Sequence, residues 1–201
     1  MTDFEPILPV VVIDDARDAE PLARALVAGG IRQAEITLRT AAALGALRTM
    51  SAIPGITVGV GTVLEPEQAE AAIDAGAAFV VSPGLSDAVV AVCERRRVQA
   101  VPGVATATEA MRARSLGLRT LKFFPAESSG GPAALSALSS VFPELEFVPT
   151  GGIDADRAPA YLALPSVIAV GGSWMVPRTA IAAGDFAAIE ALCRAAVGVV
   201  R

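Results

Sequence analysis

Thr120-Leu121-Lys122-Phe123-Phe124 is a short run of mainly apolar and β-branched residues that ends at Pro125, and it predicts a buried β-strand. Similar runs recur along the whole chain with starts roughly 20–27 residues apart, and alanine-rich stretches of helical spacing separate them. The pattern predicts strands at Ile7–Ile13, Ala34–Leu38, Thr57–Gly61, Ala78–Val81, Val98–Val101, Thr120–Phe124, Glu146–Pro149 and Val167–Val170.

Strands that alternate with helices in this way predict a parallel sheet covered by helices. A count of eight strands favours a closed α/β barrel of the (β/α)8 TIM type, and the length of 201 residues is near the lower limit for that fold. An open, doubly wound parallel sheet is the alternative fold. No linker, low-complexity segment or charge run marks a boundary, so residues 1–201 are predicted to form a single domain.

Helix signals lie between the predicted strands. Asp14 or Asp15 is a candidate N-cap for the first helix, and Pro66 suits a first helical turn. Thr106 and Glu109 have the spacing of a capping box, in which each side chain binds the backbone of the other residue. These signals support the helix assignments independently of hydrophobic spacing.

The composition describes an apolar, mildly acidic chain. It is 53% hydrophobic and 18% charged, with a net charge of −5, and its one basic cluster is Arg95-Arg96-Arg97. This triplet follows an apolar helical run, where a helix C-terminus favours cations, so nucleic acid is not expected as a partner. No apolar window is long enough to span a membrane, and no signal peptide precedes the first strand, so a cytoplasmic location is expected.

Metal ligands are scarce in this sequence. The chain has no histidine, and its two cysteines, Cys93 and Cys193, lie in helix-like stretches far apart in the sequence. Neither the number nor the spacing of these residues suits a transition-metal site or a disulfide framework. We therefore expect chemistry without a metal or other cofactor, in which carboxylates, lysine, tyrosine or substrate groups carry protons.

Lys122 is the only lysine, whereas the other fifteen cationic side chains are arginines. An amine can lose its proton and attack a carbonyl to form a Schiff base, which a guanidinium cannot do. Because side chains alternate along a strand, Lys122 shares a face with Thr120 and Phe124, and this face is predicted to point into the barrel. The alternative is a lysine whose stem packs among apolar residues while its ammonium group reaches solvent.

Glu35, Thr37 and Arg39 share one face of the second predicted strand, and Ile36 and Leu38 share the other. The aliphatic face suits packing against helices, so the polar face is predicted to point into the barrel, within reach of Lys122. Charged residues are seldom buried unless they are paired or functional. A catalytic role is therefore predicted for this face, with a structural ion pair between Glu35 and Arg39 as the alternative.

Two glycine-rich segments close the last two predicted strands, Pro149-Thr150-Gly151-Gly152 and Gly171-Gly172-Ser173. In (β/α)8 barrels the loops after strands seven and eight often bind phosphate. Glycines expose backbone N–H groups, and a helix N-terminus that follows them favours an anion. Each Gly-Gly alone suits a tight turn, but the two together predict a phosphate site.

Six motifs of this chain, in order, resemble those of the bacterial 2-keto-3-deoxy-6-phosphogluconate (KDPG) and 4-hydroxy-2-oxoglutarate (KHG) aldolases. They are Glu35-Ile36-Thr37-Leu38-Arg39-Thr40, Gly59-Val60-Gly61-Thr62-Val63-Leu64, Ser82-Pro83-Gly84, Lys122-Phe123-Phe124-Pro125-Ala126-Glu127, Pro149-Thr150-Gly151-Gly152-Ile153 and Gly171-Gly172-Ser173-Trp174. The resemblance runs from about Pro9 to Val176, and the block that begins with Lys122 is its most specific part.

The resemblance implies a metal-free class I aldolase on an eight-stranded barrel, commonly a homotrimer in the cytoplasm. It implies cleavage of KDPG to pyruvate and D-glyceraldehyde 3-phosphate, as in the Entner–Doudoroff pathway. Carried over by position, Lys122 is the Schiff-base lysine and Glu35 the general acid/base, while Arg39 and Thr62 contact the pyruvyl carboxylate.

The rest of the substrate site is also implied by the resemblance. Pro83 and Phe124 line the pocket, and Thr150 lies near the substrate hydroxyl groups. The phosphate site is formed by Gly151, Gly152, Gly172 and Ser173.

The same residues also suit other functions. KHG aldolase and 2-keto-3-deoxy-6-phosphogalactonate aldolase activities use the same chemistry on related substrates. A phosphate-binding isomerase or epimerase would use the loops after strands seven and eight without a nucleophilic Lys122. A non-catalytic sugar-phosphate sensor would bind ligand without turnover.

Overall fold

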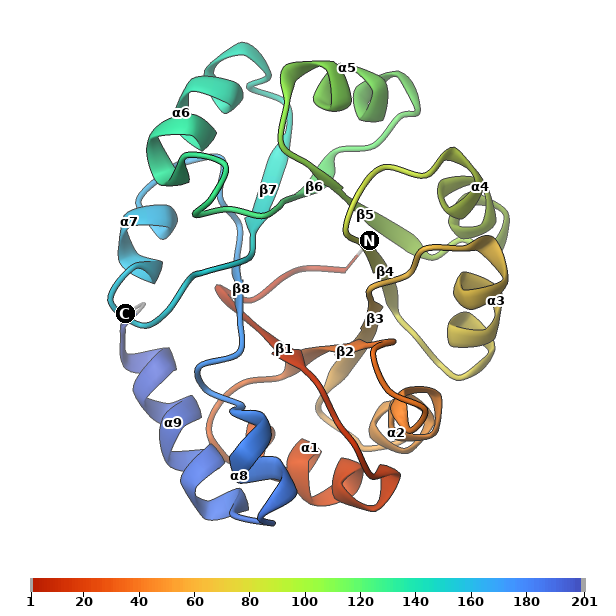
Figure 1. Cartoon of the computed structure of the whole chain (residues 1–201), viewed down its shortest axis with the longest axis vertical. Coiled ribbons are helices and arrows are strands. Elements are labelled where there is room, and N and C mark those ends of the chain that lie inside the picture. The colour runs from red at the N-terminus through yellow and green to blue at the C-terminus, as the bar shows by residue number, and fades with distance from the viewer. Residues whose placement is uncertain (1, 200–201) are drawn as a thin grey trace.

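The computed structural model describes residues 2–199 and shows a barrel of parallel strands inside a ring of helices (Figure 1). Neighbouring strands follow the order β7-β6-β5-β4-β3-β2-β1-β8, and bridges from Phe147 to Val167 and from Thr150 to Gly171 join β7 to the segment that leads into and through β8. The fold is therefore the predicted closed barrel and not the open sheet. Its strands in the described residues are β1 (Ile7–Val11), β2 (Gln33–Thr37), β3 (Thr57–Gly61), β4 (Phe79–Ser82), β5 (Gln99–Val104), β6 (Thr120–Phe123), β7 (Glu146–Pro149) and β8 (Val170–Gly172).

The helices cover the outside of the barrel (Figure 1). Within residues 2–199, none of them is both long and apolar enough to cross a membrane. They are the 3-10 helix η1 (Ala16–Asp18) and the α-helices α1 (Ala19–Ala28), α2 (Ala43–Ser51), α3 (Pro66–Asp74), α4 (Asp87–Arg96), α5 (Ala107–Ser115), α6 (Gly131–Val141), α7 (Ala158–Leu162), α8 (Arg178–Ala182) and α9 (Phe186–Val199).

The helix signals of the sequence have the expected partners, with one correction. Thr106 and Glu109 form the predicted capping box, in which the Thr106 amide donates to Glu109 Oε2 at 2.9 Å. Pro66 is the first residue of α3. Asp15 caps the 3-10 helix η1 rather than α1, because a turn of 3-10 helix precedes α1.

The eighth strand is displaced from its prediction. Val167–Val170 was the predicted strand, but the structure has β8 at Val170–Gly172. The Val170 amide donates to Pro6 O at 2.9 Å, and Gly171 and Gly172 pair with Leu8 and Pro9 of β1. Pairing with β1 outweighs the strand preference of the β-branched residues, because intrinsic strand propensity contributes less than pairing and packing with neighbouring strands. Gly171 and Gly172 thus lie in the strand and not in the loop after it.

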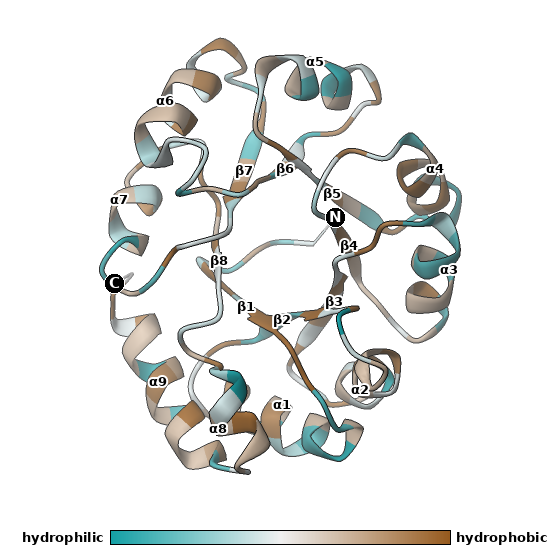
Figure 2. Cartoon of the chain, in the orientation of Figure 1, coloured by the Kyte–Doolittle hydropathy of each residue, from teal (hydrophilic) through white to brown (hydrophobic). Residues whose placement is uncertain are grey.

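Two hydrophobic layers follow from side-chain alternation along the strands. In β2, Ala34 and Ile36 are buried between the sheet and the helices, while Glu35 faces the barrel interior. In Figure 2 strand β1 is largely hydrophobic, whereas the surrounding helices mix hydrophobic and hydrophilic residues. The layer inside the barrel is a separate apolar cluster. Its buried residues are Leu8, Phe79, Val81, Val101, Val148 and Ala169.

Candidate active site

Lys122 and Glu35 meet inside the barrel. Lys122 is on β6 and Glu35 on β2, and these strands lie four places apart in the ring, on opposite walls. Lys122 Nζ lies 3.3 Å from Glu35 Oε1, with only 6% of Lys122 and 1% of Glu35 exposed. Both side chains therefore point inward, as strand alternation predicts, and the lysine does not reach bulk solvent.

Gly61 makes room for the Glu35 carboxylate. It is the last residue of β3 and pairs with Thr37 of β2, so its missing side chain faces the barrel interior. A Cβ at Gly61 would lie 1.9 Å from Glu35 Oε1. This role of Gly61 was not predicted from the sequence, although alternation along Thr57–Gly61 places it on the inward face.

Gly61→Ala is expected to displace the Glu35 carboxylate and lower kcat by roughly 10–100-fold, the scale of a catalytic group misplaced by about 1 Å. Steady-state kinetics and a thermal unfolding curve together check this result. Gly198→Ala, in a helix position with open space around its Cβ, is the matched control and should leave kcat unchanged. Unchanged kcat in folded Gly61→Ala would contradict the spatial role of this glycine.

The pair leaves one carboxylate oxygen available. Glu35 Oε2 is buried and accepts no hydrogen bond from any described protein group. A buried acceptor without a partner costs about 1–3 kcal/mol, so this oxygen suits a substrate hydroxyl or its proton. Lys122 Nζ also lies 5.2 Å from the centroid of the Phe124 ring, within the range of a cation–π contact. The site can therefore hold an amine and pass protons to and from a carboxylate.

Arg39 lies at the rim of the barrel rather than inside it. β2 ends at Thr37, and the Arg39 amide donates to Thr37 O at 2.8 Å in a tight turn. Strand alternation stops at that turn, so Arg39 is not enclosed in the barrel interior as predicted, and its side chain is exposed. Among the described residues Arg39 forms no ion pair with Glu35, which removes the alternative of a structural pair on this strand. A rim position leaves the guanidinium available for a substrate carboxylate.

Thr62 has a strained backbone directly after β3. Its φ is +59°, a left-handed conformation that is rare for a β-branched residue. Such strain costs about 1–3 kcal/mol and is concentrated at ligand-binding sites. The sequence contains no signal for this conformation, which the neighbouring strands impose: the next amide, of Val63, donates to Val81 O at 3.2 Å.

The two glycine-rich segments lie side by side, because Thr150 and Gly171 form a parallel bridge. Gly152 has a φ of +78°, and no hydrogen bond among residues 2–199 uses the amide of Gly152 or Ser173 as its donor. Free amides in adjacent loops suit an anion. The helices α7 and α8 begin several residues later, so the expected helix N-termini directly behind these glycines are absent from the described structure.

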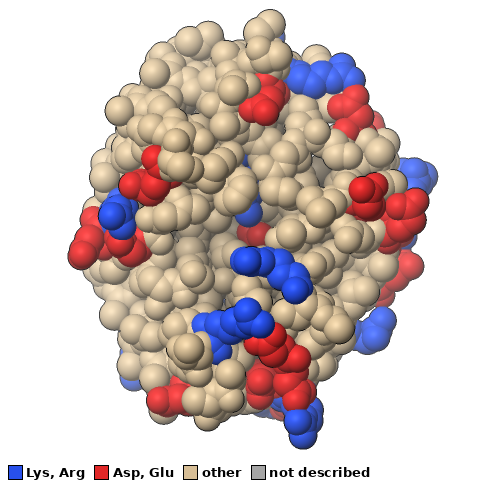
Figure 3. All heavy atoms as spheres, viewed as in Figure 1, with Lys and Arg blue, Asp and Glu red and all other residues tan. Residues whose placement is uncertain are grey.

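The other predicted site residues lie at the same ends of their strands. Pro83 follows β4 and Phe124 follows β6, and both are partly buried. Thr150 follows β7 and is 6% exposed. In Figure 3 this face of the barrel is hollowed at its centre, with cationic and anionic atoms visible in the hollow. Among residues 2–199, no three His, Cys, Asp or Glu side chains are arranged to hold a metal ion.

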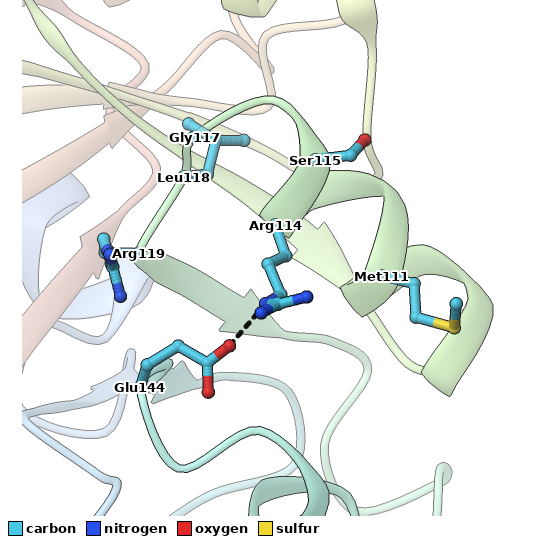
Figure 4. A pocket seen from close by; sticks show the side chains of 7 residues that line it. All are labelled: Met111, Arg114, Ser115, Gly117, Leu118, Arg119 and Glu144. Carbon is cyan, nitrogen blue, oxygen red and sulfur yellow. Dashed lines mark hydrogen bonds and ion pairs between the residues drawn. The ribbon is translucent and has the colours of Figure 1, made fainter.

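A separate cavity of about 690 Å³ opens at the opposite end of the barrel (Figure 4). Its lining residues lie in α5 or precede β6 and β7, whereas the predicted site residues lie at the carboxyl ends of the strands. In such barrels the chemistry occurs at the carboxyl ends, so this cavity is not the active site. It is lined by Met111, Arg114, Ser115, Gly117, Leu118, Arg119 and Glu144.

Comparison with known proteins gives matches over nearly the whole chain. A family model described as KDPG and KHG aldolase matches residues 2–192. A 2-dehydro-3-deoxy-phosphogluconate aldolase of Pseudomonas aeruginosa is 48% identical over 192 residues, which cover 95% of this chain and 87% of that protein. A KHG/KDPG aldolase of Escherichia coli K12 is 44% identical over 193 residues, covering 96% and 91%.

Solved structures match equally well. The KDPG aldolase of Zymomonas mobilis ZM4 with 3-phosphoglycerate has a TM-score of 0.90 at 46% identity, covering 96% of this chain and 91% of that one. The KDPG aldolase of Legionella pneumophila, with pyruvate captured as a covalent carbinolamine intermediate, has a TM-score of 0.92 at 42% identity, covering 96% and 94%. Sequence and fold therefore agree on the same set of relatives.

Proposed function

This chain belongs to the KDPG and KHG aldolase family, and from that membership we propose that it is a class I aldolase that cleaves KDPG to pyruvate and D-glyceraldehyde 3-phosphate. The observation that carries the proposal is the buried contact of 3.3 Å between Lys122 and Glu35. A nucleophilic amine beside a proton acceptor, in a closed apolar barrel, is the arrangement that imine chemistry needs.

Lys122 first forms an imine with the substrate. The neutral amine attacks the C2 ketone of KDPG, and Glu35 carries protons while the carbinolamine loses water. The protonated imine that results withdraws electrons from the neighbouring carbons. Because Glu35 lies 3.3 Å from the amine, one carboxylate can serve both the addition and the dehydration.

Cleavage then uses the imine as an electron sink. Glu35 removes the proton of the C4 hydroxyl, the C3–C4 bond breaks, and its electron pair moves into the imine to form an enamine. Glyceraldehyde 3-phosphate leaves, the enamine takes a proton at C3, and hydrolysis releases pyruvate. No step needs an electron acceptor from outside, since the imine accepts the pair and returns it to carbon.

The two ends of the substrate bind different loops. Arg39, at the rim after β2, and Thr62, after β3, contact the pyruvyl carboxylate. Pro83 and Phe124 line the pocket, and Thr150 lies near the substrate hydroxyls. The phosphate tail binds the loop after β7, at Gly151 and Gly152, and the end of β8, at Gly172 and Ser173, where the free amides of Gly152 and Ser173 support an anion site.

A comparison of kcat/KM for KDPG, its galactonate epimer and KHG tests this assignment. KDPG is expected to exceed KHG by roughly 10–100-fold, because amide hydrogen bonds to a charged group contribute about 1.5–3 kcal/mol each. KHG has a carboxylate in place of the phosphorylated tail and makes fewer of these bonds. A larger kcat/KM for KHG would reassign the enzyme to that substrate.

KHG cleavage is the second candidate activity, and the observation that favours it is the 44% identity to a protein of E. coli named for both substrates. Family membership does not support a phosphate-binding isomerase or a non-catalytic sensor. Borohydride inactivation in the presence of pyruvate separates both of them from an aldolase, because it requires an imine on Lys122.

The quaternary structure and location follow the same family. We propose a homotrimer of the 20.4 kDa chain, in the cytoplasm, acting in the Entner–Doudoroff pathway. The relatives named as KDPG aldolases support the pathway assignment, and the family resemblance supports the trimer.

A further inference from the structure

Glu127 is a charged residue in the turn after β6, five positions after Lys122, and the mechanism above gives it no role. Its amide donates to Gly151 O at 3.1 Å, and the amide of Ala126 donates to Thr150 O at 2.8 Å. These bonds continue the pairing of β6 with β7 beyond the ends of both strands. The turn that follows the catalytic lysine is therefore joined to the loop proposed to bind phosphate.

The stem of Glu127 packs against the α-carbon of Gly152. A Cβ at Gly152 would lie 2.8 Å from Glu127 Cγ and 2.9 Å from Glu127 Cβ. Gly152 also has a φ of +78°, so a side chain at this position would be both strained and obstructed. The loop is thus pressed directly onto the Glu127 side chain.

Both carboxylate oxygens of Glu127 are held by residues that follow the Gly151-Gly152 loop. The Tyr161 hydroxyl on α7 donates to Oε1 at 2.6 Å, and Arg157 Nε lies 3.3 Å from Oε2. Burial, followed by the hydrogen bond to Glu127, raises the pKa of Tyr161 above its usual range, so the hydroxyl stays a donor. Arg157 also donates to Gly152 O at 3.5 Å.

The charge of Glu127 is offset by these partners. A bare carboxylate beside an anion site would repel a phosphate, but here Tyr161 provides a hydrogen bond and Arg157, which also pairs with Asp154, provides a nearby positive charge. Both carboxylate oxygens are engaged by protein groups. Glu127 is therefore suited to shape the loop and not to bind the substrate itself.

We propose that Glu127 is a positioning residue that holds the Gly151-Gly152 loop in its phosphate-binding form and so gives the enzyme its preference for phosphorylated substrates. This inference rests on the proposed function, because it assumes that the loop binds the phosphate of KDPG. Glu127 then affects only the binding of the phosphorylated end of the substrate. The pyruvyl end, at Lys122 and Glu35, does not depend on it.

Two measurements on the intact protein separate the two ends of the substrate. The KM for KDPG cleavage reports on both ends, whereas deuterium exchange into the methyl group of pyruvate, followed by NMR, needs only the pyruvyl end. The variants are Glu127→Ala, Glu127→Gln and Tyr161→Phe. Glu144→Ala is the matched control. The Glu144 side chain is 30% exposed, close to the 34% of Glu127, and it is also paired with an arginine, Arg114. It lies at the opposite end of the barrel (Figure 4).

Glu127→Ala is expected to raise the KM for KDPG by roughly 10–100-fold through displacement of the loop, with pyruvate exchange unchanged. Glu127→Gln keeps the stem over Gly152 and an acceptor for Tyr161, so its KM should stay within about fivefold of wild type, the most that an exposed ion pair usually contributes. Tyr161→Phe should raise the KM less than Glu127→Ala. Glu144→Ala should match wild type in both measurements.

A wild-type KM for KDPG in Glu127→Ala would overturn the inference. So would an equal loss of KDPG cleavage and pyruvate exchange, since that pattern means general damage to the barrel. Circular dichroism identifies unfolded variants. If Glu127→Ala is unfolded, the KM values of the other two variants test the inference: Tyr161→Phe should have a raised KM for KDPG, and Glu127→Gln should stay within about fivefold of wild type. A wild-type KM in Tyr161→Phe would then overturn the inference. Failure of the proposed function looks different, because the wild-type protein itself would then not cleave KDPG.

Discussion

Lys122→Arg is expected to lower KDPG turnover by roughly 10⁴-fold or more, the scale seen when a nucleophile that acts in concert with other groups is removed. The guanidinium keeps the positive charge beside Glu35 but stays protonated and cannot form an imine. The rate of pyruvate release in a coupled assay measures the effect. Mass spectrometry after borohydride treatment with pyruvate should show an adduct on wild-type Lys122 and none on the variant.

The charge is the reason for choosing arginine. Lys122 is 6% exposed and its partner Glu35 is 1% exposed, so removal of the charge would leave a buried carboxylate unpaired and destabilise the protein by about 3–5 kcal/mol. Lys122→Met, nearly equal in length but uncharged, measures that penalty as a lower melting temperature. Substantial turnover by folded Lys122→Arg, or an adduct on another residue, would refute Lys122 as the nucleophile.

Glu35→Gln is expected to slow KDPG cleavage by roughly 10²–10⁴-fold, the usual contribution of a positioned acid or base. Glutamine fits the space that Gly61 leaves and keeps an oxygen near Lys122, but it cannot accept the proton of the C4 hydroxyl. Single-turnover kinetics with KDPG measure the chemical step directly. Exchange of the pyruvate methyl protons should fall with it, because this step also needs a proton acceptor.

Binding provides the control for this variant. Arg39 and Thr62 are unchanged in Glu35→Gln, so borohydride should still trap pyruvate on Lys122, although more slowly. A cleavage rate near that of wild type would exclude Glu35 as the acid/base. Loss of trapping together with a lower melting temperature would indicate a packing role at this position.

Local patterns in the sequence predicted most of the barrel. The bounds of β3 and β7 match their predictions, and Lys122 and Glu35 lie on the predicted faces of their strands. Alternation depends only on local backbone geometry, which explains this success. It fails where the strand ends, and for that reason Arg39 lies at the rim and not inside the barrel.

Other features depend on contacts between distant segments. β8 begins at Val170 because β1 pairs there, although the preceding residues have the stronger strand preference. Thr62 takes a left-handed conformation between two strands, with no signal in its own neighbourhood. Glu127 was part of a recognisable motif, but its packing on Gly152 and its bond to Tyr161 join segments 25 and 34 residues away.

The sequence by itself determined the fold class, the single amine and its inward orientation, and the family to which the chain belongs, because periodicity, composition and motifs are properties of the linear chain. Only the tertiary structure decided which of these groups meet. Closure of the sheet puts β2 opposite β6, so that Lys122 and Glu35 approach to 3.3 Å, and it places Thr150 beside Gly171 and Gly152 against Glu127. Such distances are set by strand pairing and packing across the whole barrel, which no local stretch of sequence specifies.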